Sequence, residues 1–463
     1  MHDNVSSNPA RIMIRSRLKL IGRSLLIGPS PVTWRVPALF VVLLVAGCAT
    51  VKPPQSLDEI PFMERAQTQE RDGLRITVAA LSEDEARSAF GVNLKKKRIQ
   101  PVWIDIENNT DQPRHLMLSS VDPRYYSAME AASLFHKVGN PTRNDQLDRY
   151  FEGHKIDPEL LPRSRNSGFV YANLKRGTRE VRIRLLAEGG IEYFEFYVSV
   201  PGLKADWERV DFESIYTREQ FVQYDDDAAF AEALRQLPCC TTKKNGTGAG
   251  DPINIVVIGE PDNILAPFIA AGWDETEIVT AGTSWKTFKS FFGAEYKYSP
   301  ISALYIYLRP QDAGLQKARD TINERNHLRL WLAPMTYNGK LVFVGGMSRD
   351  IGVRMTTKAW NLTTHEIDPD IDEAREYLAE DLATAGRVAT FGYIDGVGYA
   401  SKDDPMHNHL GSPWWTDGRR LVIELSNTQV ELDEIEIFSF HVSRPVVPVL
   451  RGQTAASGSD GEP

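Results

Sequence analysis

Between residues 73 and 216, hydrophobic and polar side chains alternate with a period of two. The alternating runs lie at 74–80, 102–107, 181–185 and 194–200. Such alternation is typical of strands with one buried and one solvated face. Gly189-Gly190 separates the last two runs and is a hairpin signal. The pattern predicts an antiparallel β-sandwich over residues 73–216, with a long, partly helical insertion at 122–166.

Residues 217–251 follow a different pattern. Phe230, Leu234 and Leu237 repeat at helical spacing and predict a helix that leads to Cys239-Cys240. The stretch 241–251 is rich in Lys, Gly and Thr, a composition that indicates a linker between two domains.

From residue 252 onward, helical and strand patterns mix without regular alternation. A helix is predicted near 262–272, another near 284–292 and a third at 369–385. Strands are predicted at 253–258, 304–308, 327–332, 341–344, 388–394, 421–425 and 435–442. Irregular mixing of this kind favours an α+β domain, here over 252–445, rather than a doubly wound α/β fold. Residues 446–463 are small, polar and acidic, which predicts a disordered tail.

The first 47 residues have the layout of a secretory signal. A basic stretch precedes an apolar run at 36–45 that is too short to span a bilayer, and small residues follow it. Leu44-Val45-Ala46-Gly47-Cys48 resembles a bacterial lipobox, in which the Cys48 thiol accepts lipid. The predicted mature protein is therefore anchored to a membrane through Cys48, with a polar tether at 48–72. An ordinary signal peptide and an uncleaved anchor are the alternatives. Because Ala49 is not acidic, the resemblance to sorted lipoproteins implies the outer membrane, facing the periplasm.

Charge and cysteine content narrow the function classes. The whole chain has a formal net charge of −9, and residues 1–47 carry six basic residues against one acid. The remainder is thus more acidic still, which argues against nucleic-acid binding because phosphates would repel it. Besides Cys48 the chain has Cys239 and Cys240. These neighbours could form a vicinal disulfide or simply occupy a tight turn, and their spacing fits no metal site.

Three polar clusters in the second domain are candidates for chemistry. In the run 325–331, Arg325, His327, Arg329 and Trp331 share one face of a predicted strand. Two guanidinium groups beside an imidazole could hold a phosphate or carboxylate. The simpler interpretation, which the sequence favours, is a solvated strand face.

The second cluster, at 345–352, follows a strand with Gly345-Gly346 and contains Asp350. It lacks the ending of a phosphate loop and predicts a hairpin turn. The third, at 365–372, combines His365 with a helix start in which Asp368 caps and Pro369 opens the helix. His365 with nearby carboxylates could also serve as an acid or base. No metal or cofactor is expected, and a covalent serine enzyme is unsupported because the Gly-x-Ser-x-Gly motif is missing.

At these residues the second domain resembles the LssY C-terminal-domain family of bacterial envelope proteins. The similar stretches, in order, are 298–305, Arg309-Pro310-Gln311-Asp312, 325–331, 345–352, 364–368 and Thr416-Asp417-Gly418. The family pattern often has a second histidine where Asn326 and Glu366 stand here, which weakens a metal interpretation. The resemblance implies one polar site formed by Arg309, His327, Arg329, Asp350 and His365. Asp312, Arg325 and Asp368 complete the candidate set.

Two functions fit these observations. The first is a lipid-anchored envelope protein with a binding or accessory role, whose partners are the membrane and another envelope protein. The second is an envelope hydrolase acting on a phosphorylated or glycolipid substrate. In that reading His327 and His365 transfer protons while Arg309 and Arg329 hold the anion. The enzyme hypothesis requires these side chains to converge in one place with perturbed ionisation.

Overall fold

The computed structural model describes residues 54–260, 264–277, 301, 303–318, 325–355 and 363–442, with only the backbone of 353–355 and 363–365. The predicted signal segment at 1–47, Cys48, the helix predicted at 284–292 and the predicted tail at 446–463 lie outside the described residues. No helix among the described residues is both long and apolar enough to cross a membrane.

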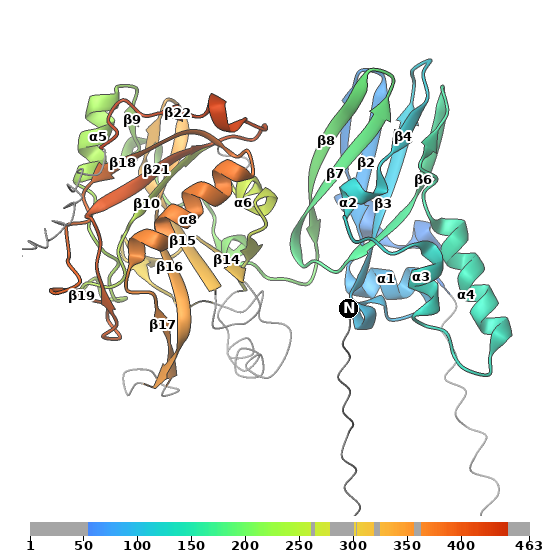
Figure 1. Cartoon of the computed structure of the whole chain (residues 1–463), viewed down its shortest axis with the longest axis horizontal. Helices are drawn as coiled ribbons and strands as arrows, with labels where there is room; N and C mark the ends of the chain where they lie inside the picture. The colour runs from blue at the N-terminus through green and yellow to red at the C-terminus, as the bar shows by residue number, and fades with distance from the viewer. Residues whose placement is uncertain are drawn as a thin grey trace, which may run out of the picture. The chain divides into compact units, whose positions relative to one another are not determined.

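Two antiparallel four-stranded sheets form the first domain (Figure 1). The first sheet has the order β1 (Gln67–Arg71), β2 (Leu74–Ala80), β3 (Ile99–Asn108) and β6 (Ser164–Asn173). The second has the order β5 (Glu159–Leu160), β4 (Arg114–Leu116), β7 (Gly177–Ala187) and β8 (Gly190–Val200). The hairpin predicted at Gly189-Gly190 is present, with Ala187 paired to Gly190. Part of the predicted tether instead belongs to this domain, because β1 pairs with β2.

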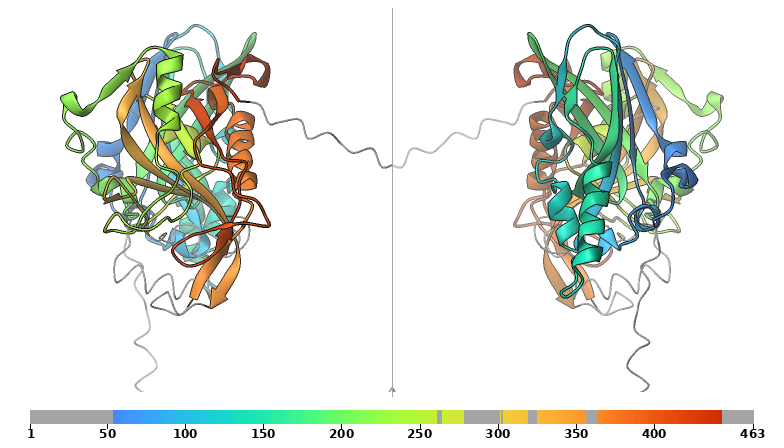
Figure 2. Two further views of the ribbon diagram at one scale, coloured as in Figure 1. Left: turned by 90° about the vertical axis from the view of Figure 1, so that its left-hand side faces the viewer. Right: turned by 90° about the vertical axis from the view of Figure 1, so that its right-hand side faces the viewer.

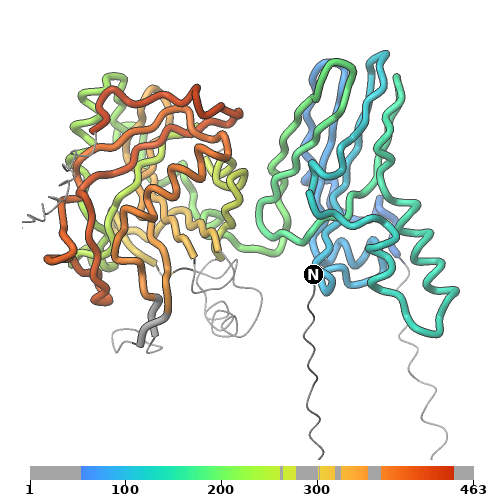
Figure 3. Tube along the Cα trace, viewed as in Figure 1, coloured from blue at the N-terminus to red at the C-terminus, as the bar shows by residue number. Residues whose placement is uncertain are grey.

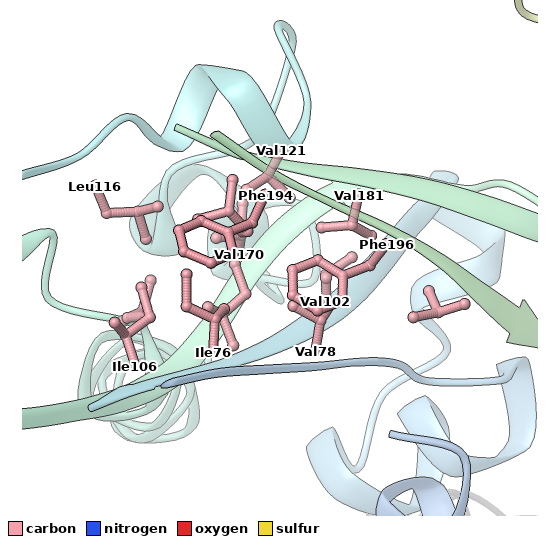
Figure 4. Packing of buried hydrophobic residues seen from close by; sticks show 14 of the residues in the cluster. Ile76, Val78, Val102, Ile106, Leu116, Val121, Val170, Val181, Phe194 and Phe196 are labelled. Carbon is pink, nitrogen blue, oxygen red and sulfur yellow. The ribbon is translucent and has the colours of Figure 1, made fainter. Parts of the chain in front are cut away.

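The core of the sandwich lies between the inward faces of the two sheets (Figure 4). Ile76 and Val78 of β2 and Val102 and Ile106 of β3 face residues such as Phe196 of β8. Of the labelled side chains, those on β2, β3, β7 and β8 are the ones that the period-two alternation assigns to the buried face, whereas Leu116, Val121 and Val170 lie outside the predicted runs. The predicted sandwich is therefore confirmed.

Helical segments cover the outer face of the first sheet. These are α1 (Glu83–Phe90), the 3-10 turn η3 (Leu94–Lys97), α3 (Ala128–Ser133) and α4 (Pro141–His154), while α2 (Leu118–Val121) is a single turn. Ser82 and Ser127 begin α1 and α3 with capping boxes, and the Asn140 side chain caps α4. Phe90 and Phe151 pack with Phe169 of β6 in a second apolar cluster. The insertion predicted at 122–166 thus contains the helices α3 and α4, and its last residues belong to β6.

The stretch 241–251 is not an inter-domain linker. Thr241 is fully buried, its backbone N–H donates to the Asp251 carbonyl at 2.9 Å, and Thr242 donates to the Tyr305 carbonyl at 2.8 Å. Before it, β9 (Val222–Tyr224) pairs in parallel with β15 (Arg325–Tyr337), and α5 (Asp227–Arg235) packs on the same sheet. The content of Lys, Gly and Thr predicted a linker here. The prediction failed because composition does not reveal hydrogen bonds made to distant residues.

A ten-stranded mixed sheet forms the second domain. In Figure 3 the chain of this domain runs from green through yellow and orange to red. Its main order is β11 (Asp274–Glu275), β14 (Ala313–Ala318), β15 (Arg325–Tyr337), β16 (Lys340–Met355), β10 (Ile255–Gly259), β21 (Arg419–Leu425), β18 (Val388–Asp395) and β22 (Glu436–Ile437). β17 (Thr363–Ile367) pairs with β16. β10–β21, β15–β9 and β18–β22 are parallel pairs and the others are antiparallel, which confirms the α+β class.

Helices lie on both faces of this sheet (Figure 1, Figure 2). On one face, α8 (Ile371–Thr384) and α6 (Ala266–Ala270) bury Leu328, Leu330 and Phe343. On the other, α5 packs against Trp331 and Val344. The small hairpins are β12 (Tyr305–Ile306) with β13 (Arg309–Pro310), and β19 (Met406–His407) with β20 (Pro413–Trp414). The predicted strand at 435–442 is reduced to β22, which follows the short turn η7 (Leu432–Glu434).

Candidate functional site

The polar face of β15 is buried. Arg325, His327 and Arg329 alternate with Leu328 and Leu330, and their exposed fractions are 1%, 5% and 7%. The leucines pack beneath α8, whereas Trp331, on the same face as the arginines, belongs to the cluster with α5. The solvated-face interpretation is therefore wrong. Alternation places side chains on a face but does not say whether that face is covered.

Asp350 of β16 meets this face. Asn326 pairs with Arg349 and His327 with Ser348, so Asp350 lies one step beyond, across from Arg325. Oδ2 of Asp350 is 3.6 Å from Nη2 of Arg325 and 3.3 Å from Nε2 of His327. Arg325, His327, Arg329 and Asp350 are hereafter called the basic cluster.

Burial changes the ionisation of the basic cluster. It raises the pKa of Asp350 to about 7, although the charges of Arg325 and Arg329 act in the opposite direction. Burial also lowers the pKa of Arg325 and of Arg329, against the attraction of Asp350. Taking guanidinium groups out of water is costly, and a negative charge held close to them offsets that cost.

Three residues that we had not predicted also belong to this region. Oε1 of Gln316 on β14 accepts a hydrogen bond from Nη1 of Arg325 at 2.8 Å. The negative charge of Asp251 counters the burial of Arg329, and Asp251 Oδ1 accepts from Asn408 Nδ2 at 2.9 Å. Ser348 is buried opposite His327. The sequence offered one signal for Gln316: a polar amide directly after the small and apolar residues Ala313-Gly314-Leu315.

Arg309 and Asp312 do not join the basic cluster. Nε and Nη2 of Arg309 donate to the two carboxylate oxygens of Asp312 at 3.1 and 2.9 Å. The Leu332 backbone N–H donates to Asp312 at 2.7 Å, and Arg309 also donates to the Leu332 carbonyl. Together they fasten the β12–β13 hairpin to β15, five residues beyond His327. The prediction that they share one site with His327 is wrong. Spacing along the chain cannot distinguish such a clamp from a ligand site.

His365 is placed by its backbone alone. It pairs with Val353, whereas His327 pairs with Ser348, five residues earlier on β16. At about 3.3 Å per residue, the two backbones are roughly 16 Å apart along the strand. This register does not support the predicted pairing of two histidines for proton transfer.

Asp368 is not the helix cap. Its Oδ1 accepts from the Asp370 backbone N–H at 3.1 Å, and Asp370 caps α8, which begins at Ile371. The helix starts two residues later than Pro369 because Asp368 forms a turn before it.

Gly345 and Gly346 lie inside β16 and not in the predicted turn. A Cβ atom at Gly345 would come within 2.6 Å of the Arg329 carbonyl oxygen, and one at Gly346 within 2.9 Å of the Pro252 carbonyl oxygen. Glycine is needed at both positions because the backbone of another segment approaches closely. At Gly345 that segment is Arg329 itself.

Cys239 and Cys240 are joined by a disulfide. Cys240 is buried with Ile371, Val397 and Trp414. The Ile253 N–H donates to the Cys239 carbonyl at 2.7 Å, directly before β10. Of the two arrangements considered from the sequence, the structure has the disulfide.

A second buried ionic network surrounds Arg375 of α8, and sequence reasoning missed it. Nη1 and Nη2 of Arg375 each lie 3.0 Å from an Asp417 oxygen, and Arg419 binds Asp417 from the other side. These arginines hold the pKa of Asp417 well below its usual range, against the effect of burial. The Asp417 N–H donates to Asp372 at 2.7 Å, which ties the start of α8 to β21. We regard this network as structural because each charged group has a partner within it.

The basic cluster can bind an anion, and the His327–Asp350 pair can move a proton near neutral pH. Among the described residues, no three His, Cys, Asp or Glu side chains come together as a metal site would require. A comparison with curated proteins gives no match. Residues 232–419, which include the whole basic cluster, match the family model described as LssY C-terminus, so this part of the chain is similar to the LssY C-terminal domain.

Proposed function

We propose that the protein is a lipid-anchored component of the bacterial envelope, and that its LssY-type domain binds an anionic group at the basic cluster. The observation that carries this proposal is the convergence of Arg325, His327 and Asp350 on one buried face. Residues from two strands meet there within 3.3 to 3.6 Å.

The chemistry of the cluster suits a phosphate or carboxylate. The arginine fork presents parallel N–H donors that match two oxygens of such groups, and the imidazole adds a further donor when protonated. Partial protonation of Asp350 near neutral pH removes a competing negative charge. The same group could come from a free ion or from a phosphorylated envelope component.

Support for the anchor comes from the N-terminal sequence. Leu44-Val45-Ala46-Gly47-Cys48 ends a basic and then apolar segment, and polar residues follow. Diacyl modification of Cys48 anchors stably, since each buried methylene contributes about 0.8 kcal/mol. Mass spectrometry of the mature N-terminus tests this part: a lipidated Cys48 supports it, and an unmodified Cys48 contradicts it.

Calorimetric titration of the detergent-solubilised full-length protein with inorganic phosphate tests the binding site. Arg329→Lys keeps the charge but loses the fork, so phosphate affinity should fall roughly tenfold or more. Arg349→Lys is the matched control, because Arg349 is on the adjacent strand and contacts Asn326 at 3.1 Å outside the cluster. Equal affinity in both variants, with both folded by circular dichroism, would contradict the proposal.

Hydrolysis of a phosphorylated envelope component is the second candidate function. The observation that favours it is the pairing of His327 with a carboxyl group whose pKa is about 7, which suits acid–base transfer. Turnover of a phosphomonoester or phosphodiester substrate that disappears in His327→Gln, while phosphate still binds, would support this function over binding alone.

A further inference from the structure

The connection between α3 and α4 forms an exposed apolar tip on the sandwich domain. Val138 is fully exposed, and Met129 and Leu134 have exposed fractions of 49% and 38%. Lys137 lies between Leu134 and Val138 in the sequence. Apolar side chains beside a lysine suit the boundary between lipid tails and headgroups, because the lysine stem can reach towards water. Met129, Leu134, Lys137 and Val138 are called the apolar tip.

The described chain begins next to the base of α4. The Gln55 N–H donates to the Ser88 carbonyl of α1 at 2.9 Å, and the Tyr150 hydroxyl donates to the next carbonyl, Ala89, at 2.7 Å. Gln55, near the start of the described residues, and Tyr150, in the last turns of α4, are thus fixed to neighbouring residues of α1. From there, α4 runs back nine residues to Pro141, about 14 Å along its axis. Figures 1 and 3 show the α3–α4 connection projecting beyond α1.

The distance from this point to Cys48 is limited by the chain. Six residues lead from Cys48 to Pro54, and they can span at most about 20 Å. This reach is comparable with the 14 Å projection of α4 estimated above. A lipid on Cys48 therefore leaves the apolar tip within reach of the surface of the membrane that holds the lipid.

Positive charge lies at the same end of the domain. Lys96, Lys97 and Arg98 of the η3 region are exposed, and Lys95 pairs with Glu83 of α1 at 2.6 Å. Basic side chains close to a bilayer attract anionic headgroups by about 1 kcal/mol each.

From these observations we infer that the apolar tip inserts into the headgroup layer of the membrane that carries the Cys48 lipid. This inference rests on the proposed lipid anchor. The tip then acts as a second contact that sets how the sandwich domain stands on the membrane.

A fluorescence experiment on the full-length lipidated protein tests this insertion. Val138→Cys is labelled with the environment-sensitive probe NBD and reconstituted on vesicles of phosphatidylethanolamine and phosphatidylglycerol, with or without brominated acyl chains. Leu186→Cys is the matched control. It is also exposed, at 51%, but lies beside the β7–β8 turn, nine residues along β7 from Gly177. Because both sites are exposed, neither substitution should disturb folding.

Brominated lipid should quench the probe at position 138 at least twofold more strongly than the probe at position 186. Equal quenching at the two positions, or none at either while the protein floats with the vesicles, overturns the insertion but leaves the anchor intact. Failure of the protein to float with vesicles at all overturns the anchor, and the insertion with it.

Discussion

Nε2 of His327 lies 3.3 Å from Oδ2 of Asp350, and both side chains are almost completely buried. A buried carboxyl group is normally driven towards its neutral form, whereas nearby arginines favour the charged form. Here burial prevails and raises the pKa of Asp350 to about 7. Asp350 can therefore gain or lose its proton near neutral pH, beside His327.

The stability of the protein should depend on pH through Asp350. Because the folded pKa, about 7, lies above the ordinary value of 3.8, the folded state holds the proton more tightly than the unfolded state. This contribution is fully present below pH 3.8 and is lost as the pH rises through about 7. It amounts to at most roughly 4 kcal/mol.

Urea unfolding of the wild type and of Asp350→Asn at pH 4.5 and pH 8 measures this contribution. The variant mimics the neutral acid, so the wild type should lose stability relative to it as the pH rises. A difference between the two proteins that stays constant or grows in favour of the wild type would show that the pKa of Asp350 is not raised.

Arg309 and Asp312 should matter for stability and not for binding. Asp312→Asn removes the charge that holds Arg309 and should lower the free energy of unfolding by roughly 3 kcal/mol, as expected when one partner of a buried pair is lost. Phosphate affinity, measured by the titration described above, should stay within about twofold of the wild-type value. A large loss of affinity in a folded Asp312→Asn protein would place these residues back in the binding site.

The Arg375–Asp417 pair should show strong energetic coupling. Each single alanine variant leaves a buried charge and should cost roughly 3 to 5 kcal/mol, while the double variant should cost clearly less than the sum. A double-mutant cycle on unfolding free energies gives this coupling. Additive effects would mean that Asp417 interacts mainly with Arg419.

The disulfide between Cys239 and Cys240 should contribute little to stability. A bridge between adjacent residues closes a minimal loop and so restricts the unfolded chain by only about 1 kcal/mol. Replacing both cysteines with serine and comparing urea unfolding tests this estimate. A loss of several kcal/mol would show that the bridge is needed for the packing of Cys240 against Trp414.

Sequence patterns predicted the sandwich well because each strand has one wet and one dry face, as Ile76 and Val102 illustrate. The patterns failed where the polar face of a strand is covered by other parts of the protein. Arg325, His327 and Arg329 alternate like surface residues, and only the packing of the whole sheet shows that they are buried. Gly345 and Gly346 suggested a turn because the neighbouring carbonyls of Arg329 and Pro252 belong to distant segments.

The candidate site was predicted only in part, again because the sequence does not show how side chains pack. Arg325, His327 and Asp350 could be nominated from their chemistry, but Arg309 and Asp312 have the same chemistry and form a clamp. Gln316 reaches the cluster through strand register, and Asp251 acts on Arg329 through its charge although it is distant in the sequence; a single sequence displays neither relationship.

Binding of inorganic sulfate as a function of pH tests the central claim most directly, because sulfate keeps its double charge across the range and any change comes from the protein. Protonation of Asp350, whose pKa is about 7, removes a negative charge from the cluster, so sulfate affinity should rise at least tenfold between pH 8.5 and pH 5.5. The rise should be smaller in Asp350→Asn. No sulfate binding, or binding of equal strength at both pH values, would contradict the assignment of the basic cluster as an anion site.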